Sequence, residues 1–316
     1  MRPGARGPFW DVQELTNHPF SWPSSSLYAL DENLIGEVAG RSQQPRRLNL
    51  KTRSFWMVAV AATLIGIGHT DGIAQTRAQQ LAIEAPDGAR ITGFLLQDAK
   101  AEKDAPLAIL MHAMAGSSLH WLAKGNVSGG DDISASLVKR GYRVVGLDAR
   151  SHGVRKDDIH PMKRLEDLRA NRPDPYLAMI NGTMSDYDVL LKDVKGRFGK
   201  PRHVMVIGYS MGAQMAVLFA AKHAEVTHVV TMVPPAVASA PSVAPVNHAR
   251  KVKADWLLLT ASRDEFATKA DNEALAGAAG GTLTHVVYDS PHMLPAHYVD
   301  TVIDWVGKIS GSTAAN

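Results

Sequence analysis

The pentapeptide Gly208-Tyr209-Ser210-Met211-Gly212 combines residue types whose spacing suits nucleophilic chemistry. It follows the apolar run 204–207 and precedes a helical pattern that begins at Met211, which predicts a sharp strand-to-helix turn at Ser210. Such a turn holds the serine exposed in a strained conformation, and the N–H groups of the following helix face developing negative charge. Ser210 is therefore a candidate nucleophile for attack on a carbonyl carbon.

Two polar residues later in the chain are suited to be the base and the acid that a serine nucleophile needs. Asp264 follows the apolar run 256–260, and His292 follows the apolar run 286–288. Each is predicted at the carboxyl end of a strand, as Ser210 is, and sites in open parallel sheets form along that edge. We assign His292 as the base that takes the serine proton and Asp264 as the acid that orients its imidazole.

Alternatives stay open for all three residues. The pentapeptide by itself is a weak signal, because an ordinary glycine-rich turn with a surface serine has the same letters. A bystander role in a polar loop is the alternative for Asp264 and for His292. Glu265 is the reserve acid and His297 the reserve base, and we prefer His292 because His297 falls inside the helix predicted over residues 296–309.

The elements that must position these residues alternate between strands and helices from about residue 80 onward. Short apolar runs indicate strands buried on both faces. The alternation predicts an α/β fold with a mostly parallel central sheet and helices on both faces. The predicted strands are Leu81 to Glu84, Arg90 to Gln97, Leu107 to Met111, Arg143 to Leu147, His203 to Ile207, Val226 to Met232, Trp256 to Thr260 and Leu283 to Tyr288, and the predicted helices are Asp131 to Lys139, Ser185 to Phe198, Met211 to Lys222, Ala267 to Ala279 and Ala296 to Ile309.

Any cover over the site is expected to be small or absent. Residues 150–180 are polar and contain three prolines, so they are predicted to form a long loop or a small cap. The helix after them is predicted to begin with Ser185 as its N-cap. The connection over residues 233–255 is too short for a large helical cap.

Residues 80–310 resemble the α/β-hydrolase superfamily of serine hydrolases, which includes esterases, lipases and peptidases. The resemblance rests on the turn at Ser210 and on the order serine, acid, histidine along the chain. Met111 to Gly116 is similar to the family's His-Gly segment after the third strand. By that match the backbone N–H groups of Met114 and Met211 form the oxyanion hole.

Two positions depart from the family's pattern. Ala113 stands where a glycine is usual in the His-Gly segment. Leu147 to Gly153 is similar to the family's Asp-x-Arg-Gly-His-Gly turn, and Ser151 replaces a glycine there. That turn is structural in the family, and a structural role that pins its loop is also our interpretation of His112.

The resemblance implies a serine hydrolase that cleaves a carboxylic ester through an acyl-enzyme intermediate, with no metal or organic cofactor. A serine peptidase or acyltransferase on the same fold is one alternative, so the substrate expected is a small-molecule ester or amide. A catalytically inactive binding protein that keeps the fold is the other. A histidine pair in the helical H-E-x-x-H arrangement is absent from the sequence, which disfavours a zinc hydrolase.

The first 74 residues are interpreted as a targeting segment that precedes the folded domain. Phe55 to Gly68 is an uncharged apolar run that follows four basic residues and precedes a small-residue cleavage site at Ala74, as in a secretory signal peptide. We therefore assign residues 46–74 as a signal peptide and expect export, to the periplasm or the exterior, with no stable membrane span after cleavage. Residues 1–45 are interpreted as a disordered or mis-annotated extension. An uncleaved anchor or a buried apolar helix is the alternative.

Composition excludes several classes of function. The chain has no cysteine, so disulfides, thiolate metal sites and a cysteine nucleophile are ruled out. Its 34 Lys and Arg face 31 Asp and Glu, for a net charge of +3, and no dense basic block with interleaved aromatics occurs. Nucleic acid is therefore not expected as a partner.

Overall fold

A computed structural model describes residues 76–124 and 129–313 of the chain. The predicted extension (1–45) and signal peptide (46–74) lie outside the described residues. No helix among the residues that the structure describes is both long and apolar enough to traverse a bilayer.

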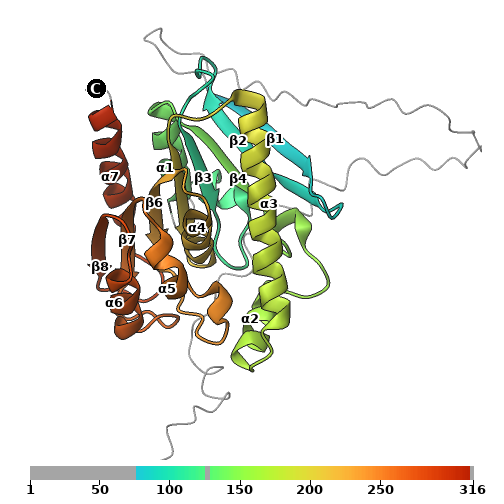
Figure 1. Cartoon of the computed structure of the whole chain (residues 1–316), viewed down its shortest axis with the longest axis vertical. Coiled ribbons are helices and arrows are strands. Elements are labelled where there is room, and N and C mark those ends of the chain that lie inside the picture. The colour runs from blue at the N-terminus through green and yellow to red at the C-terminus, as the bar shows by residue number, and fades with distance from the viewer. Residues whose placement is uncertain (1–75, 125–128, 314–316) are drawn as a thin grey trace, which may run out of the picture. The chain divides into compact units, whose positions relative to one another are not determined.

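The described residues form one sheet of eight strands, and the predicted α/β fold is confirmed (Figure 1). The strands are β1 (Thr76–Glu84), β2 (Arg90–Asp98), β3 (Leu107–Met111), β4 (Arg143–Leu147), β5 (Val204–Tyr209), β6 (Val226–Met232), β7 (Asp255–Ala261) and β8 (Leu283–Tyr288). Their order across the sheet is β1-β2-β4-β3-β5-β6-β7-β8. The hairpin β1–β2 is antiparallel, and β2 pairs antiparallel with β4. The other six strands, in the sheet order β4-β3-β5-β6-β7-β8, are parallel to one another.

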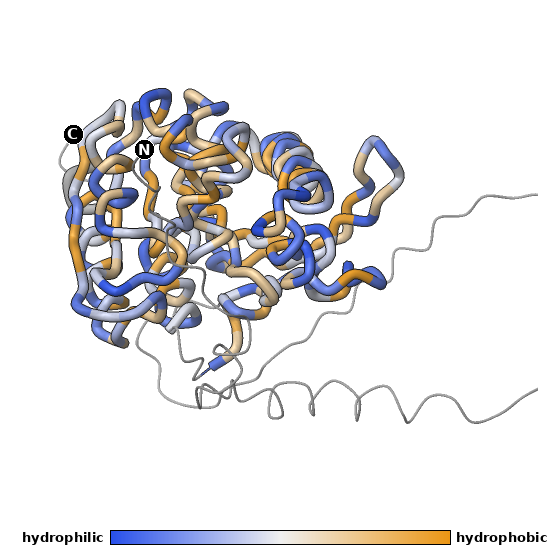
Figure 2. The backbone as a smooth tube through the Cα atoms, turned by 90° about the horizontal axis from the view of Figure 1, so that it is seen from below, coloured by the Kyte–Doolittle hydropathy of each residue, from blue (hydrophilic) through white to orange (hydrophobic). Residues whose placement is uncertain are grey.

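The parallel strands are buried on both faces, as their uninterrupted apolar runs predict. In β3, Leu107 and Ile109 belong to the core cluster on one face of the sheet, and Ala108 and Leu110 belong to the cluster on the other face. Figure 2 shows apolar segments in the interior of the backbone trace and hydrophilic segments at many of the outer turns. The alternation within one strand therefore supplies two cores at once.

Helices cover both faces of the sheet (Figure 1). Residues of α3, α4 and α6 pack in the first cluster, and residues of α1 and α7 pack in the second. The helices are α1 (Gly130–Lys139), α2 (Pro161–Arg169), α3 (Asp174–Phe198), α4 (Met211–Lys222), α5 (Pro245–His248), α6 (Lys269–Gly277) and α7 (Tyr298–Thr313).

The helix predicted to begin at Ser185 begins much earlier, at Asp174, so that prediction was wrong. Ser185 does not cap the helix, because its hydroxyl donates to the backbone oxygen of Asn181 in the preceding turn at 3.1 Å. Asn181-Gly182 weakens the helical pattern in the sequence, but a Cβ at Gly182 would lie 2.6 Å from the Arg150 side chain. The glycine therefore leaves room for the Arg150 side chain, although helix propensity disfavours it.

The same shift corrects the long loop predicted as one alternative for residues 150–180, and the small cap, the other alternative, stays a prediction. This segment is not a continuous loop, since it contains α2 and the first turns of α3. Pro161 and Pro175, which suggested loop structure, both stand in the first turn of a helix. Proline fits there because the first helical N–H groups have no partner inside the helix.

Candidate active site

Ser210 lies in a sharp turn between β5 and α4, with φ 54° and ψ −115°. This left-handed backbone conformation is strained for a residue with a side chain. Two glycines make the turn possible, because a Cβ at Gly208 would lie 2.1 Å from the Gly212 oxygen and one at Gly212 would lie 2.0 Å from the Met111 oxygen. The Ser210 N–H donates to the Met232 oxygen at 2.8 Å, which ties the turn to β6.

The structure brings Ser210, His292 and Asp264 into one hydrogen-bonded chain. The His292 Nε2 atom lies 2.8 Å from the Ser210 Oγ atom, and Nδ1 lies 2.9 and 3.0 Å from the two carboxylate oxygens of Asp264. A carboxylate only accepts hydrogen bonds, so Nδ1 carries the proton and Nε2 presents its lone pair to the serine hydroxyl. The imidazole is therefore in the tautomer that can take the serine proton.

The Asp264 side chain is only 1% exposed and the His292 side chain 16%. The Asp264 carboxylate also accepts the N–H of Phe266 at 2.8 Å, and the ring of Phe266 packs against the His292 ring with centroids 4.5 Å apart. Each contact restricts the rotation of a group in the chain, so the alignment is held from several sides.

Side chains next to Ser210 and Asp264 hold the backbone of His292. Tyr209 donates from its hydroxyl to the His292 oxygen at 3.0 Å, and Glu265 accepts the His292 N–H at 3.2 Å. Sequence reasoning missed Tyr209, because nothing in the chain order reveals a hydrogen bond to a segment 83 residues away. The only signal was adjacency to a candidate nucleophile.

Neither reserve residue takes a place in the hydrogen-bonded chain. Glu265 contacts the backbone of His292 and not its ring, so it does not take the place of Asp264. His297 packs on the ring of Tyr288 at 5.3 Å between centroids. The prediction that His297 lies inside a helix was wrong, since α7 begins one residue later at Tyr298.

The predicted oxyanion donors, Met114 and Met211, lie at the two segments that meet beside the serine turn. Met211 is the first residue of α4, and the N–H groups of a first helical turn have no partner inside the helix. Met114 lies in a turn after β3, which the Gly116 N–H closes on the Ala113 oxygen at 3.1 Å. The contact of Gly212 with Met111 packs α4 against the end of β3. The role of both N–H groups stays a prediction.

His112 pins the loops after β3 and β4 together, the structural role expected of it. Its Nδ1 lies 2.8 Å from the Ala113 oxygen, and its Nε2 accepts the Ala149 N–H at 3.0 Å. Complete burial lowers the pKa of His112 to about 4, so the ring is neutral. A neutral ring with one donor and one acceptor satisfies both partners.

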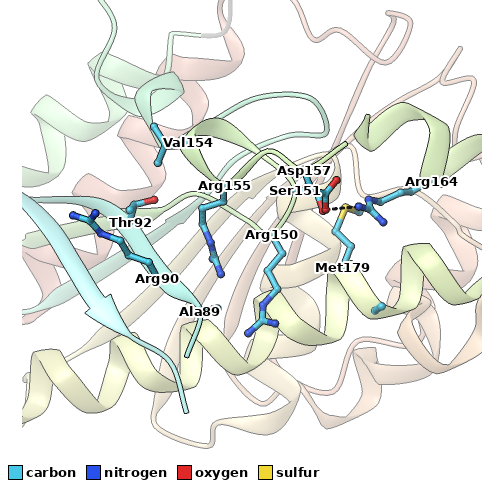
Figure 3. Close-up of a pocket in the computed structure, with 11 residues that line it drawn as sticks. Ala89, Arg90, Thr92, Arg150, Ser151, Val154, Arg155, Asp157, Arg164 and Met179 are labelled. Carbon is cyan, nitrogen blue, oxygen red and sulfur yellow. Dashed lines mark hydrogen bonds and ion pairs between the residues drawn. The ribbon is translucent and has the colours of Figure 1, made fainter. Parts of the chain in front are cut away.

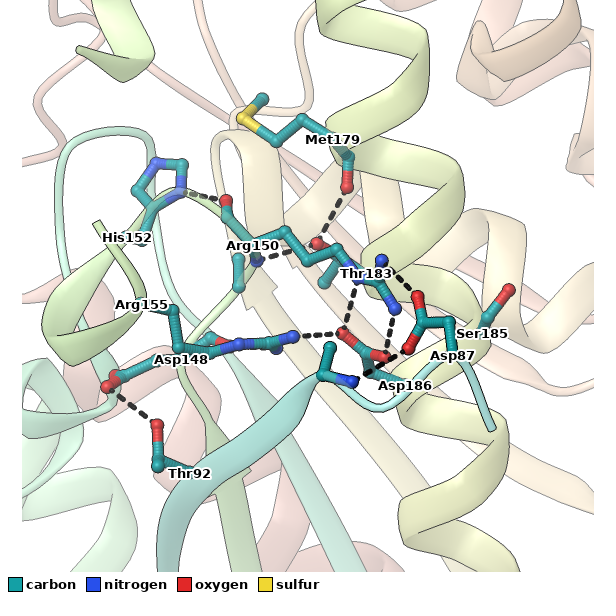
Figure 4. Close-up of polar contacts among 12 residues, drawn as sticks. Asp87, Thr92, Asp148, Arg150, His152, Arg155, Met179, Thr183, Ser185 and Asp186 are labelled. Carbon is teal, nitrogen blue, oxygen red and sulfur yellow. Dashed lines mark hydrogen bonds and ion pairs between the residues drawn. The ribbon is translucent and has the colours of Figure 1, made fainter. Parts of the chain in front are cut away.

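The turn after β4 is anchored by Asp148 and Asp186 (Figure 4). Asp148 is buried and accepts the N–H groups of Ser118 and Val154 at 2.7 and 3.2 Å. Arg150 donates to both carboxylate oxygens of the fully buried Asp186 at 2.9 and 2.8 Å. Ser151 replaces a glycine of the family turn and has φ 67°, which explains why glycine is usual there.

Three large apolar side chains, those of Trp121, Met211 and Met232, belong to the core. Trp121 and Met232 are fully buried, and Met211 is 1% exposed. By contrast Met293, next to His292, is 43% exposed, and Met114 is half-buried. Among these residues, only the last two are accessible to a bound molecule.

Within the described ranges, no three histidine, aspartate or glutamate side chains gather where they could hold a metal ion.

Comparison with known proteins identifies the family. A model described as the alpha/beta hydrolase family matches residues 108–301, more than half of the chain. Among curated proteins none matches. Solved structures match over most of their length, at identities that show the fold alone.

Three of those structures illustrate the likeness. A cold-adapted esterase from an Arctic intertidal metagenomic library is 18% identical with a TM-score of 0.60, and the match covers 78% of this chain and 99% of that one. An esterase of Pyrococcus furiosus is 16% identical with a TM-score of 0.56, over 80% and 97% of the two chains. An acetyl xylan esterase from Paenibacillus is 13% identical with a TM-score of 0.60, over 78% and 89%.

Proposed function

This chain belongs to the alpha/beta hydrolase family, and we propose that it cleaves carboxylic esters of small molecules through an acyl-enzyme intermediate on Ser210. The hydrogen-bonded chain from the Ser210 hydroxyl through His292 to Asp264 carries the proposal. A serine hydroxyl is a weak nucleophile until an adjacent base accepts its proton. Here the base lies 2.8 Å from the hydroxyl oxygen and is already in the accepting tautomer.

The first half of the reaction forms the acyl-enzyme. Ser210 Oγ attacks the ester carbonyl carbon while its proton passes to His292 Nε2, and Asp264 stabilises the imidazolium that results. The imidazolium then gives this proton to the alcohol oxygen as the carbon–oxygen bond breaks. The alcohol leaves, and the acyl group stays on the serine as an ester.

The carbonyl oxygen becomes negatively charged during the attack. In our proposal the backbone N–H groups of Met114 and Met211 hold this oxyanion. The amino end of α4 favours negative charge at the same place, because the helix dipole is positive there. Preorganised donors of this kind are worth about 3 kcal/mol each in characterised hydrolases.

The second half repeats these steps with water. His292 takes a proton from a water molecule, whose oxygen attacks the acyl carbon, and returns the proton to Ser210 Oγ as the acid product leaves. Ser210 itself is half-buried, so water can reach the acyl group. The balance is one ester and one water converted to one acid and one alcohol.

Ester substrates are proposed ahead of amides for one reason. The three solved structures that share the fold are named as esterases, although their low identity transfers only the fold. A peptidase, an acyltransferase and an inactive binding protein are the alternatives that active-site labelling and a substrate panel distinguish from an esterase.

Labelling with a fluorophosphonate probe tests the nucleophile. The wild-type protein is expected to be labelled, whereas Ser210→Ala is expected to give no signal. Ser185→Ala is the matched control, because Ser185 is an exposed helical serine with no contact to the triad. Absence of labelling in the folded wild-type protein would favour the inactive binding protein.

A substrate panel then tests the reaction class. We expect hydrolysis of p-nitrophenyl esters and little hydrolysis of matched aminoacyl amides. Faster hydrolysis of the amides would indicate a peptidase, and accumulation of a transferred acyl product with an added alcohol or amine would indicate an acyltransferase.

We further propose that the chain is exported, from the signal-peptide pattern of residues 46–74. N-terminal sequencing of the native protein is expected to start after Ala74. A mature protein that still begins at Met1 would contradict both the signal peptide and the interpretation of residues 1–45.

A further inference from the structure

A pocket of about 600 Å³ lies beside the turn after β4 (Figure 3). Its volume is within the range of sites that hold small organic molecules. None of its lining residues belongs to the Ser210–His292–Asp264 chain, so a ligand site here does not rest on the proposed function. The pocket is lined by Ala89, Arg90, Thr92, Arg150, Ser151, Val154, Arg155, Asp157, Arg164, Ala178 and Met179.

Four arginines and one carboxylate line this pocket. Arg150 and Arg155 both form ion pairs with Asp186, whose side chain is fully buried (Figure 4). The Arg155–Asp186 ion pair has a nitrogen–oxygen distance of 2.7 Å. Arg150 also pairs with Asp87 at 2.7 Å. These two guanidinium groups are therefore rigidly placed, and their charges are matched by residues that do not line the pocket.

Arg164 supplies a buried donor that has no partner. Its terminal nitrogen pairs with Asp157 at 2.5 Å, and its side chain is 10% exposed. Its Nε atom is buried, and no hydrogen-bond acceptor for it occurs in the described part of the chain. A buried N–H without an acceptor is unfavourable, so an acceptor oxygen brought by a ligand would satisfy it.

Arg90 supplies a guanidinium group that takes part in none of the ion pairs of the described residues. It is exposed at the start of β2, where the hairpin register places it opposite Glu84. The ion pairs of the other three arginines involve Asp87, Asp157 and Asp186. The guanidinium donors of Arg90 are therefore not held in an ion pair at the pocket.

We propose that this pocket binds the oxyanion group, carboxylate or phosphate, of a small molecule. Guanidinium groups match the geometry of both anions through paired N–H donors. Arg164 Nε–H and Arg90 provide the unused donors, and the arginines fixed by Asp186 hold their guanidinium groups in place as a preorganised polar wall. The hydroxyl of Ser151, which donates to Asp157 at 2.8 Å, adds a neutral polar group at the same wall.

Isothermal titration calorimetry in low-salt buffer tests the proposal, with inorganic phosphate and succinate as separate probes. The wild-type protein is expected to bind at least one of them saturably, and the probe that binds more tightly identifies the anion. Arg90→Gln is expected to weaken binding tenfold or more. Arg164→Lys keeps a positive charge opposite Asp157 but loses the Nε donor, and is expected to weaken binding several-fold.

Arg77→Gln is the matched control, because Arg77 is an exposed arginine of the same hairpin that does not line the pocket. Thermal unfolding of each variant establishes that it is folded. The proposal is overturned if the wild type binds neither probe saturably, or if Arg90→Gln and Arg164→Lys are both folded and bind as Arg77→Gln does.

Discussion

The phenol oxygen of Tyr209 lies 3.0 Å from the backbone oxygen of His292, so the residue before the candidate nucleophile holds the candidate base. The same oxygen accepts the N–H of Leu294 at 3.0 Å. Burial raises the pKa of Tyr209 to about 12, so the phenol stays protonated and can donate near neutral pH. Ser210 and His292 are thus aligned by their own hydrogen bond and also by the hydrogen bond from the neighbouring Tyr209 hydroxyl to the His292 backbone.

Replacing Tyr209 by phenylalanine tests this alignment. Tyr209→Phe loses both hydrogen bonds, each worth about 1 kcal/mol, and leaves the His292 loop less ordered. We expect ester hydrolysis to show a roughly tenfold lower kcat with a smaller change in KM, since a mispositioned base slows chemistry more than binding. Steady-state kinetics and urea unfolding measure the two effects.

Tyr187→Phe is the control for the loss of a buried phenol. The Tyr187 hydroxyl is fully buried and contacts the Leu110 oxygen at 3.4 Å, away from His292. This variant is expected to lose stability and keep its kcat. Equal loss of kcat in the two variants would show that Tyr209 acts only through general stability.

Asp264→Asn is expected to lower kcat by about 10³–10⁴ with little change in fold. An asparagine amide would donate to His292 Nδ1, which drives the proton to Nε2 and removes the acceptor for the serine hydroxyl. Glu265→Gln is the matched control, because its amide oxygen can still accept the His292 N–H. Comparable losses in both variants would contradict the assignment of Asp264 as the acid.

Buried histidines make stability depend on pH. Burial lowers the pKa of His112 to about 4 and that of His152 to about 3, below the ordinary value of 6.5. The unfolded state therefore binds protons that the folded state does not. The stabilising contribution of each neutral ring is full above pH 6.5 and is lost as the pH falls toward the folded-state pKa, by about 1.4 kcal/mol per pH unit per histidine.

Urea unfolding between pH 7 and pH 4 measures this contribution. The free energy of unfolding is expected to fall over that range, and less steeply in His112→Gln, because one proton-binding group is removed. The variant is expected to be less stable at pH 7, since His112 accepts the Ala149 N–H. An unchanged slope in the variant would show that His112 does not titrate in this way.

Two glycine substitutions are expected to have opposite effects. Gly212→Ala places a methyl group 2.0 Å from the Met111 oxygen, so β3 and α4 must move apart and both stability and hydrolysis are lost. Gly196→Ala meets nothing within 4 Å at an exposed position inside α3, and is expected to raise the free energy of unfolding by about 0.5–1 kcal/mol. Thermal unfolding of both variants measures these changes in stability. A Gly212→Ala variant as stable as the wild type would show that β3 and α4 do not need to pack so closely.

The sequence by itself determined the fold class and the candidate triad. Apolar runs such as Leu107–Met111 identify strands buried on both faces, because a parallel sheet covered by helices exposes neither face. The position of Ser210, Asp264 and His292 after such runs was sufficient to expect them at one sheet edge, since the carboxyl ends of parallel strands share that edge.

Only the tertiary structure decided the contacts that align those residues and the start of α3. The hydrogen bonds of Tyr209 and Glu265 to His292 join segments that chain order does not relate. Gly182 lowers helix propensity locally, yet the helix continues through it, and the Arg150 side chain from the turn after β4 packs against that glycine. Local pattern follows backbone preference and strand or helix periodicity, whereas these features depend on partners that folding brings from distant parts of the chain.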